Sequence, residues 1–489
     1  MPIVVTIGGK VKPSGAKGHY CKQVFNGQDM DRIEEQDSST QEQVERLVNP
    51  SGKKRKDMTN RERVQMLQRK LYLSAKQDKR RRFYVLYDKV FLDYILRESW
   101  QRVKSQGGSP GIDGQDFAAI EQEGVEQFLT GLKEELRTKT YKPSAVRRIY
   151  IPKPNGEQRP LGIPTVKDRV AQMACKLVIE PIFEADFEDS SYGFRPKKSA
   201  QDAIIKIKEY LQTGYTEVYD ADLSKYFDTI PHDKLMKTLA LRISDPRILE
   251  LIKKWLKAPV YENGRYTGGR TSTMGTPQGG VISPLLANIY LHLLDRIVTN
   301  LKGIFAKAGI RIVRYADDFV LMGRTLTEAI ITKVHEILNR MELRINEKKS
   351  RCIDARKISF HFLGFTIRYD RSIFDGTKRF WHIKPSDKAC KRMRQNINLS
   401  LKRMGHYPPK ELVKELNWIL RGWLNYFEIQ GVSYTAIARR KLNWYLRERL
   451  PRYFNRKSQR KTRLYRKQAF TLLVNNYGLI DPLVFHPAT

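Results

Sequence analysis

Short runs of β-branched and aromatic residues alternate with segments of helical periodicity between residues 145 and 370. Such runs favour strands, whereas apolar residues at a spacing of about 3.6 favour helices. The strand-like runs are 148–151, 217–219, 311–315, 319–322 and 360–367. Helical patterns between them include 200–211 and 327–341. The alternation predicts a mixed α and β domain. It contains no Gly-x-Gly-x-x-Gly or Walker loop, so a nucleotide would have to be held in another way.

Two adjacent carboxylates, Asp317 and Asp318, lie between two of these runs in the segment Arg314-Tyr-Ala-Asp-Asp-Phe-Val320. A hairpin turn would place them at its tip. Adjacent aspartates repel each other, and their burial requires compensation by cations or metal. An Asp-Asp pair alone is usually a solvated polar turn, but the hydrophobic flanks argue against that interpretation here.

A third carboxylate, Asp222, follows the run 217–219 and precedes a helix expected near Pro231. Two strand ends that carry carboxylates can converge on one site. Nucleotidyl transfer uses such a cluster, because two Mg²⁺ ions roughly 3.5–4 Å apart clamp the attacking and leaving oxygens. Mg²⁺ prefers a few carboxylates together with waters and phosphates. The three aspartates fit this chemistry.

The charge balance indicates a polyanionic partner. The 489 residues include 90 Lys and Arg against 53 Asp and Glu, a net charge of +37, which favours nucleic acid. A solvated basic surface and an anionic membrane are the alternatives. The sequence has no apolar run of about 18 residues and no lipidation signal, so no membrane association is expected.

Four scattered cysteines, without a Cys-x-x-Cys pair, exclude an obvious zinc ribbon or disulfide framework. They fit a reducing compartment, and the first residues do not resemble a secretion signal. We expect a bacterial cytoplasmic protein, with an organelle left open.

The two ends of the chain differ in hydrophobic periodicity and in charge. Residues 1–60 show little periodicity, and a helix is expected from Asn60, with Asn60 itself as the cap. Residues 378–468 hold 25 Lys and Arg against 5 Asp and Glu, an excess of 20 positive charges. Within them, a helical stripe expected to pack in a core consists of Leu412, Leu416, Ile419, Leu420, Trp423 and Phe427.

Several segments, in order along the chain, resemble those of one enzyme family. Tyr315-Ala-Asp-Asp318 resembles the Tyr-x-Asp-Asp signature of reverse transcriptases, and Asp222-Leu-Ser-Lys-Tyr-Phe-Asp228 resembles their preceding metal-binding block. Gly275-Thr-Pro-Gln-Gly-Gly-Val-Ile-Ser-Pro284 resembles the block that contacts template and nucleotide. The segments 148–154, 159–164 and 191–196 resemble the finger blocks of group II intron reverse transcriptases. The resemblance covers about residues 61–470.

The resemblance implies an α+β multidomain fold, a right-hand polymerase with fingers and an antiparallel palm sheet, followed by an α-helical thumb and maturase domain. The implied divisions are a loosely ordered basic arm (1–60), N-terminal helices and fingers entry (61–145), fingers and palm (146–372), thumb/maturase (373–470) and a tail (471–489). The tail has no endonuclease motif of the kind that many family members carry.

The resemblance also implies roles for single residues. Asp222, Asp317 and Asp318 would hold two Mg²⁺ ions, whereas Asp220 and Asp228 would make structural hydrogen bonds. Phe227 would exclude a ribose 2′-hydroxyl by clash. The other implied nucleotide-binding residues are Lys153, Arg159, Gln278 and Gly279. Lys349 would protonate pyrophosphate, with the adjacent Lys348 leaving the register open. The implied primer-grip hairpin is Phe362, Leu363 and Gly364.

The implied partners are group II intron RNA, an RNA template with a DNA primer or target DNA, and dNTPs. The sequence does not decide the oligomeric state and leaves a homodimer open. Three functions are weighed: an intron reverse transcriptase that is also a maturase, a domesticated reverse transcriptase in defence or repair, and an RNA chaperone with an unused polymerase site. The intact aspartates argue against the chaperone. The long basic thumb favours the intron enzyme.

Overall fold

The computed structural model describes residues 49, 52–152, 156, 158–372, 375–457, 464 and 468–486. The chain divides into two compact units, Met1–Met58 and Thr59–Thr489, and every element described below belongs to the second. The arm expected at residues 1–60 lies almost wholly outside the described residues. The domain boundaries given above stay predictions.

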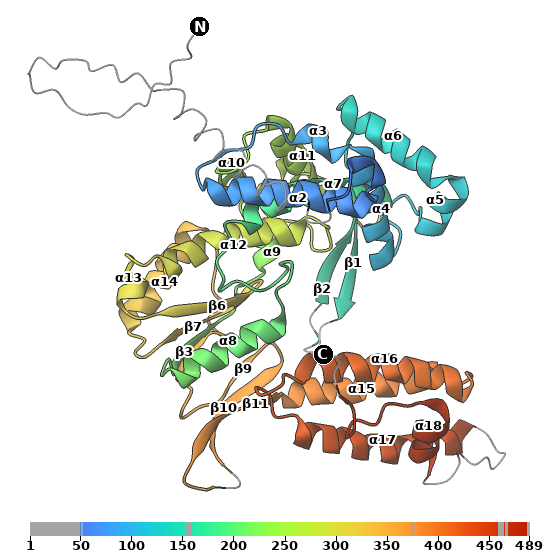
Figure 1. Ribbon diagram of the computed structural model, residues 1–489, viewed down its shortest axis with the longest axis vertical. Helices are drawn as coiled ribbons and strands as arrows, with labels where there is room; N and C mark the ends of the chain where they lie inside the picture. Colours follow the sequence, from blue (N-terminus) through green and yellow to red (C-terminus); the bar gives the residue numbers. More distant parts are fainter. Residues whose placement is uncertain are drawn as a thin grey trace, which may run out of the picture. The chain divides into compact units, whose positions relative to one another are not determined.

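A layer of helices opens the second unit: α2 (Asn60–Gln77), α3 (Tyr87–Val90), α4 (Asp93–Gln106), α5 (Phe117–Glu123) and α6 (Val125–Arg137). The expected cap of α2 was wrong by one residue. Thr59 is the cap, because Glu62 lies three residues further on and completes a capping box with it. Helices α2, α3 and α4 pack around α7 (Val166–Glu184), most of whose side chains are buried. Figure 1 shows these helices gathered together.

The finger sheet has the order β2-β1-β4-β5. Strands β1 (Val146–Pro152) and β2 (Gln158–Ile163) form an antiparallel hairpin, and β4 (Pro259–Glu262) pairs with β1 in parallel. Strand β5 (Arg265–Gly268) completes the sheet as the antiparallel partner of β4. The run 148–151 is therefore a strand, as predicted, whereas β4 and β5 were not predicted.

The palm sheet has the order β6-β7-β3-β8, with every pair antiparallel, as expected. Its strands are β3 (Glu217–Ala221), β6 (Arg311–Tyr315), β7 (Asp318–Gly323) and β8 (Arg351–Asp354). Side chains alternate between its faces. Val320 and Met322 pack on α8 (Ala200–Gln212), whereas Phe319 and Leu321 join the core that contains α12 (Ser283–Thr299) and α14 (Glu328–Arg340). Figure 1 shows α8 along one face.

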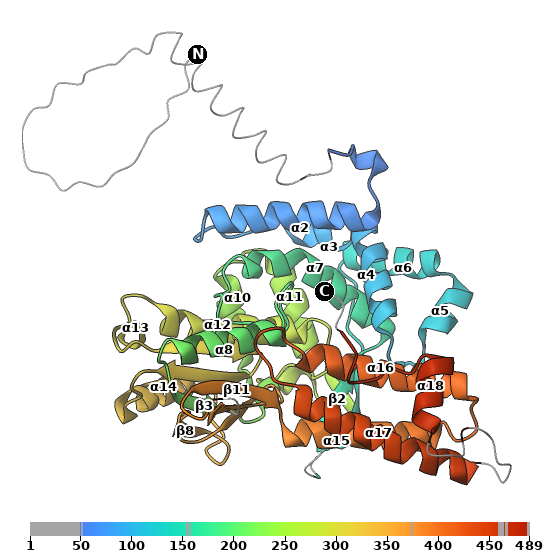
Figure 2. The ribbon, with the colours of Figure 1, turned by 60° about the horizontal axis from the view of Figure 1, so that its bottom comes forward.

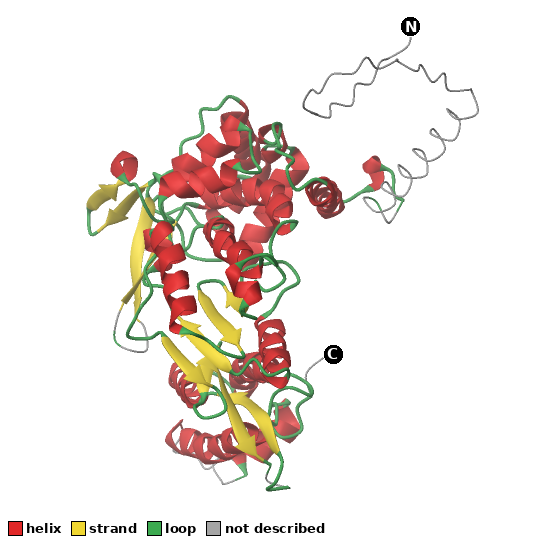
Figure 3. Cartoon of the chain, turned by 90° about the vertical axis from the view of Figure 1, so that its left-hand side faces the viewer, coloured by secondary structure: helices red, strands yellow, loops and turns green. Residues whose placement is uncertain are grey.

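Further short helices complete this part of the chain: α9 (Tyr226–Thr229), α10 (His232–Ala240), α11 (Pro246–Leu256) and α13 (Ile304–Lys307). A separate sheet of order β11-β10-β9 follows, from β9 (Phe360–Phe362), β10 (Phe365–Arg371) and β11 (Arg379–Pro385). The run 360–367 is thus a hairpin rather than one strand. Figure 3 shows these strands as yellow arrows.

The C-terminal helices are α15 (Asp387–Arg403), α16 (Pro409–Phe427), α17 (Ala436–Lys457) and α18 (Ala469–Tyr477). Figure 2 shows them side by side. Leu412, Leu416 and Leu420 of the predicted stripe are fully buried in their shared core. The mixed fold with an antiparallel sheet and a helical C-terminal region is therefore confirmed. Among the described residues, no helix is long and apolar enough to cross a membrane.

Candidate active site

Asp317 lies in the tight turn that joins β6 to β7. Tyr315 pairs with Asp318, so the turn itself consists of Ala316 and Asp317. Ala316 adopts a left-handed backbone with φ +57°, which is uncommon for a residue with a Cβ atom. Gly193 lies directly against the turn, and a Cβ atom there would overlap the backbone nitrogen of Ala316. The surrounding structure therefore imposes this turn conformation.

A buried arginine fixes the base of this turn. Arg314 is 0% exposed, and its guanidinium donates to both Asp295 carboxylate oxygens at 2.5–3.1 Å and to Asn288 Oδ1 at 3.0 Å. It also donates to the Ala316 carbonyl oxygen at 2.8 Å. Burial alone would lower the pKa of Arg314, but the charge and hydrogen bonds of Asp295 raise it above its ordinary value. The guanidinium stays charged and connects the turn to α12.

Asp222 directly follows β3, at the same edge of the palm sheet as the turn. Its Oδ2 atom accepts from Asn346 Nδ2 and from Lys349 Nζ, each at 3.2 Å. Its backbone carbonyl oxygen accepts from the Asn346 N–H at 2.8 Å, and its backbone N–H donates to Ser350 Oγ at 3.1 Å. The segment 346–350 therefore orients this carboxylate, and Lys349 is its counter-ion.

Burial and neighbouring aspartates raise the pKa of both Asp317 and Asp318. Loss of hydration and then the charge of Asp222 raise the pKa of Asp317, while Arg159 opposes the shift. Desolvation by the surrounding protein, followed by the charges of Asp317, Asp222 and Asp220, raises the pKa of Asp318 to about 7. Part of the Asp318 side chain nevertheless remains exposed to solvent. The cluster therefore carries negative charge that nearby cations only partly compensate, which favours a bound cation.

A cleft of about 1,100 Å³ opens beside these carboxylates. The residues that line it come from the finger hairpin, the palm and the loop before α12. Predicted site residues that line it are Asp222, Asp317, Lys349, Arg159, Phe227, Gln278 and Gly279. Asp318 lies beside the cleft without lining it. Lys153 lies outside the described residues. Most of the predicted site is thus in one cavity.

Aromatic rings form part of the cleft wall. Phe227 packs edge-to-face on Phe194, with ring centroids 6.4 Å apart, and on Tyr226 at 5.6 Å. No role was predicted for Phe194, nor for the cleft residues Arg148 and Asn346. The signal was available for Phe194 and Arg148, because both lie within the finger blocks quoted above.

The loop that carries Gln278 and Gly279 is clamped on β2. The Gly162 N–H donates to the Gln278 carbonyl oxygen at 2.6 Å, and Gly279 has φ +110°. A Cβ atom at position 279 would overlap the Gly162 carbonyl oxygen, so this position requires glycine. Gln278 Nε2 donates to Asp228 Oδ2 at 3.2 Å, which is a hydrogen bond of the kind expected for Asp228.

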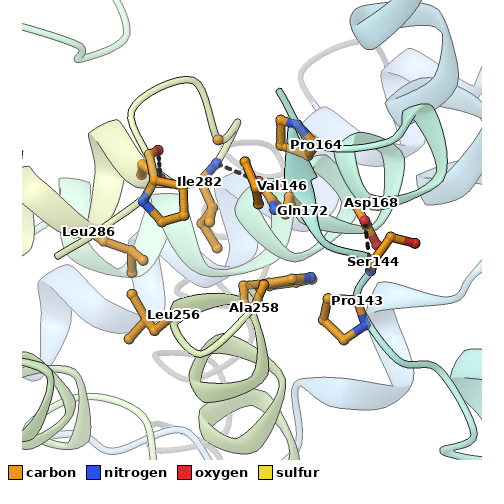
Figure 4. A pocket seen from close by; sticks show the side chains of 14 residues that line it. Pro143, Ser144, Val146, Pro164, Asp168, Gln172, Leu256, Ala258, Ile282 and Leu286 are labelled. Carbon is orange, nitrogen blue, oxygen red and sulfur yellow. Dashed lines mark hydrogen bonds between the residues drawn. The ribbon is translucent and has the colours of Figure 1, made fainter. Parts of the chain in front are cut away.

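Two buried side chains of α7 form hydrogen bonds beneath the Gln278 loop and the start of the finger hairpin. Gln172 Oε1 accepts from the Val281 N–H at 2.9 Å, and Asp168 accepts from Tyr141 at 2.5 Å and from the Ser144 N–H at 3.1 Å. Figure 4 shows Gln172 and Asp168 lining a small cavity between these segments. Its volume of about 10 Å³ is close to that of a single water site. The packing beneath the loop that carries Gln278 and Gly279 is therefore tight.

The predicted primer-grip residues lie apart from the cleft lining. Leu363 (φ +49°) and Gly364 (φ +80°) form the two-residue turn between β9 and β10, a geometry that suits hairpins. The Leu363 carbonyl oxygen accepts from Tyr426 of α16 at 3.0 Å. Phe362 is buried in the core beneath. This hairpin therefore joins the palm to the helical domain.

The donor chemistry of the cleft fits a divalent metal ion. Carboxylate oxygens are the ligands that Mg²⁺ prefers, and burial, followed by the charges of neighbouring aspartates, raises the pKa of Asp317 and Asp318. Within the described part of the chain, no three acidic, imidazole or thiol groups already converge as a ligand set. Lys349 holds one Asp222 oxygen, so metal binding at that oxygen requires Lys349 to move.

Comparison with known proteins defines the class. Residues 151–367 match the family model described as "Reverse transcriptase (RNA-dependent DNA polymerase)". Residues 390–470 match the model "Group II intron, maturase-specific domain". The fold is thus that of an RNA-directed DNA polymerase, a class that requires a divalent metal.

Individual relatives narrow the class further. Protein YkfC of Escherichia coli is 35% identical over 67% of this chain and 93% of its own length. The group II intron-encoded protein LtrA of Lactococcus lactis is 40% identical over 43% of this chain and 35% of its own length. A putative COX1/OXI3 intron 2 protein of Saccharomyces cerevisiae is 36% identical over 42% of this chain and 24% of its own length. This chain belongs to the group II intron family of reverse transcriptases and maturases.

Proposed function

We propose that this protein copies intron RNA into DNA and also binds that RNA to promote splicing and homing of the intron. Asp222 and Asp317 are the principal metal ligands, with Asp318 beside them. The observation that carries the proposal is the convergence of Asp222 and Asp317 in one cleft with Arg159, Phe227 and the Gln278 loop.

Each side chain has a distinct task in copying. Arg159 lies on the finger hairpin, close enough to Asp317 to oppose the rise in its pKa, and neutralises the triphosphate of the incoming dNTP. Gln278 and Gly279 place backbone against the nucleotide, which the absence of a side chain at Gly279 permits. Phe227, held by Phe194, presents a rigid ring that rejects a ribose 2′-hydroxyl by clash.

The leaving group and the metal complete the chemistry. Two Mg²⁺ ions, when bound by the aspartates, stabilise the attacking and leaving oxygens of the in-line displacement. Lys349 exchanges its ion pair with Asp222 for the departing pyrophosphate and gives it a proton from Nζ.

RNA binding rests on the helical domain. The excess of 20 positive charges over residues 378–468 supports phosphate contacts over a wide surface. Affinity should therefore fall steeply with salt. Recognition would follow RNA shape and 2′-hydroxyl groups rather than base edges in a deep groove.

The test separates copying from splicing. In the double variant Asp317→Ala with Asp318→Ala, primer extension on an RNA template should be lost while assisted splicing of intron RNA persists. A matched control removes two exposed acids, Asp88→Ala with Asp93→Ala, and should keep both activities. Undiminished extension by the first variant would show that the site is misassigned. Loss of splicing by a folded variant would contradict the separation of the two activities.

A further inference from the structure

A second cavity lies between β11 and the helices α15, α16 and α17, away from the catalytic cleft. Its volume is about 280 Å³, close to the lower end of the range of about 300–1,000 Å³ for small-molecule sites. Figure 2 shows the three helices that contribute to it. None of its lining residues has a role in the proposed copying reaction.

Aromatic and apolar side chains form its walls. Trp423 and Met393 line the cavity, while Tyr434 (44% exposed) and Ile437 (50% exposed) leave large apolar surfaces in solvent. The Tyr434 ring lies 5.0 Å from the His382 ring. The Tyr434 backbone N–H donates to the Ile383 carbonyl oxygen at 2.7 Å, which holds the main chain of this residue beside β11. The cavity thus offers ring faces on which a planar group can stack.

Two polar atoms of the same walls have no hydrogen-bond partner in the described structure. They are Trp423 Nε1, which can only donate, and His382 Nδ1, and both atoms are shielded from solvent. Buried polar atoms are almost always paired in native proteins. Neither atom faces the cavity as the rings stand, but a rotation of the Trp423 or His382 ring would turn its nitrogen toward a ligand edge with acceptor or donor atoms.

The cavity is also positively charged. Lys384, Arg394 and Lys441 line it against the single acidic lining residue Asp387. Among the described residues, none of these three cations forms an ion pair. They are therefore available to a phosphate group.

We propose that this cavity takes up one unstacked nucleotide of single-stranded RNA. The base stacks beside Tyr434 and accepts a hydrogen bond from Trp423 Nε1, and its phosphate contacts Lys384, Arg394 or Lys441. Single-stranded loops and bulges expose such bases, and aromatic stacking is how proteins bind them. The inference rests on the proposed RNA binding and adds a defined site to it.

Cys390 lines the cavity and provides a local reporter. Its alkylation by N-ethylmaleimide would be followed by mass spectrometry with a single-stranded RNA oligonucleotide present, and with an abasic oligonucleotide of equal length. The exposed Cys352 of β8 is the internal reference. We expect the RNA to slow alkylation of Cys390 several-fold relative to Cys352, and the abasic strand to have little effect.

Variants test the assigned contacts. Trp423→Phe keeps a ring but removes the N–H, and should raise the RNA concentration needed for protection by about five-fold. Tyr434→Ala, at an exposed position, should raise it by about ten-fold or more through lost stacking. Trp444→Phe, at an exposed tryptophan of α17 outside the cavity, should change nothing.

Total RNA binding, measured by filter retention in the same samples, separates the two proposals. If RNA binds but leaves Cys390 unprotected, the cavity proposal is wrong and RNA binding stands. Equal protection by the abasic strand, or unchanged protection in both Trp423→Phe and Tyr434→Ala, would also overturn it. If no RNA binds at all, the proposed maturase function fails as well.

Discussion

The catalytic turn should depend on a buried ion pair that does not touch the cleft. Both side chains of the Arg314–Asp295 pair are 0% exposed. Asp295→Asn keeps a side chain of the same size against the Arg314 guanidinium but removes the negative charge that compensates it. Removing one partner of a buried pair costs about 3–5 kcal/mol, because the other charge remains buried and uncompensated. Arg314 also holds the Ala316 carbonyl oxygen, so the left-handed turn beneath Asp317 should loosen and primer extension should fall.

The assay is chemical denaturation followed by tryptophan fluorescence, together with primer extension below the transition. The matched control is Asp233→Asn in α10, an exposed acid 3.9 Å from Lys237, for which a change of about 0–1 kcal/mol is expected. If Asp295→Asn unfolds at the same denaturant concentration as this control and extends primers normally, the pair does not support the turn and the reasoning is refuted.

Three further predictions follow from other contacts. Gly279→Ala should abolish nucleotide incorporation through overlap with Gly162, whereas Gly131→Ala, in open space on α6, should leave the rate unchanged and stabilise the helix by about 0.5–1 kcal/mol. Phe227→Ala should raise the ratio of ribonucleotide to deoxyribonucleotide incorporation; an unchanged ratio would refute the gate. Burial lowers the pKa of His292 to about 4 in the folded protein. As the pH decreases from about 6.5 to 4, the imidazole is protonated in the unfolded chain before it is protonated in the folded one, so the free energy of unfolding falls. His292→Phe should remove about 3 kcal/mol of that pH dependence in unfolding experiments, and an unaltered slope would count against it.

Local patterns carried much of the fold. The runs of β-branched and aromatic residues at 311–315 and 319–322 predicted β6 and β7, and the stripe around Leu416 predicted the buried face of α16. Strands β4 and β5 were missed because each has four residues without alternating burial: β4 is half-buried throughout and β5 is exposed throughout. The cap of α2 shifted to Thr59 because a capping box depends on a pair of residues rather than on one good cap former.

The site shows where sequence reasoning ends. Asp222 and Asp317 were predicted from carboxylates at strand ends and from a resemblance, and both line one cleft. Asn346 was not, because an asparagine after a helix carries no signal until the fold brings it to Asp222. The Arg314–Asp295 pair was invisible for the same reason, since its members are 19 residues apart on different elements. Long-range contacts of this kind depend on tertiary structure alone.

The central claim is that Asp222 belongs to the catalytic centre. Single-nucleotide incorporation on an RNA template with Mg²⁺ would compare Asp222→Asn with Asp220→Asn, which alters the neighbouring carboxylate that does not line the cleft. We predict that Asp222→Asn loses incorporation while Asp220→Asn keeps most of the parent rate. Equal rates in the two variants, or loss only in Asp220→Asn, would contradict the account.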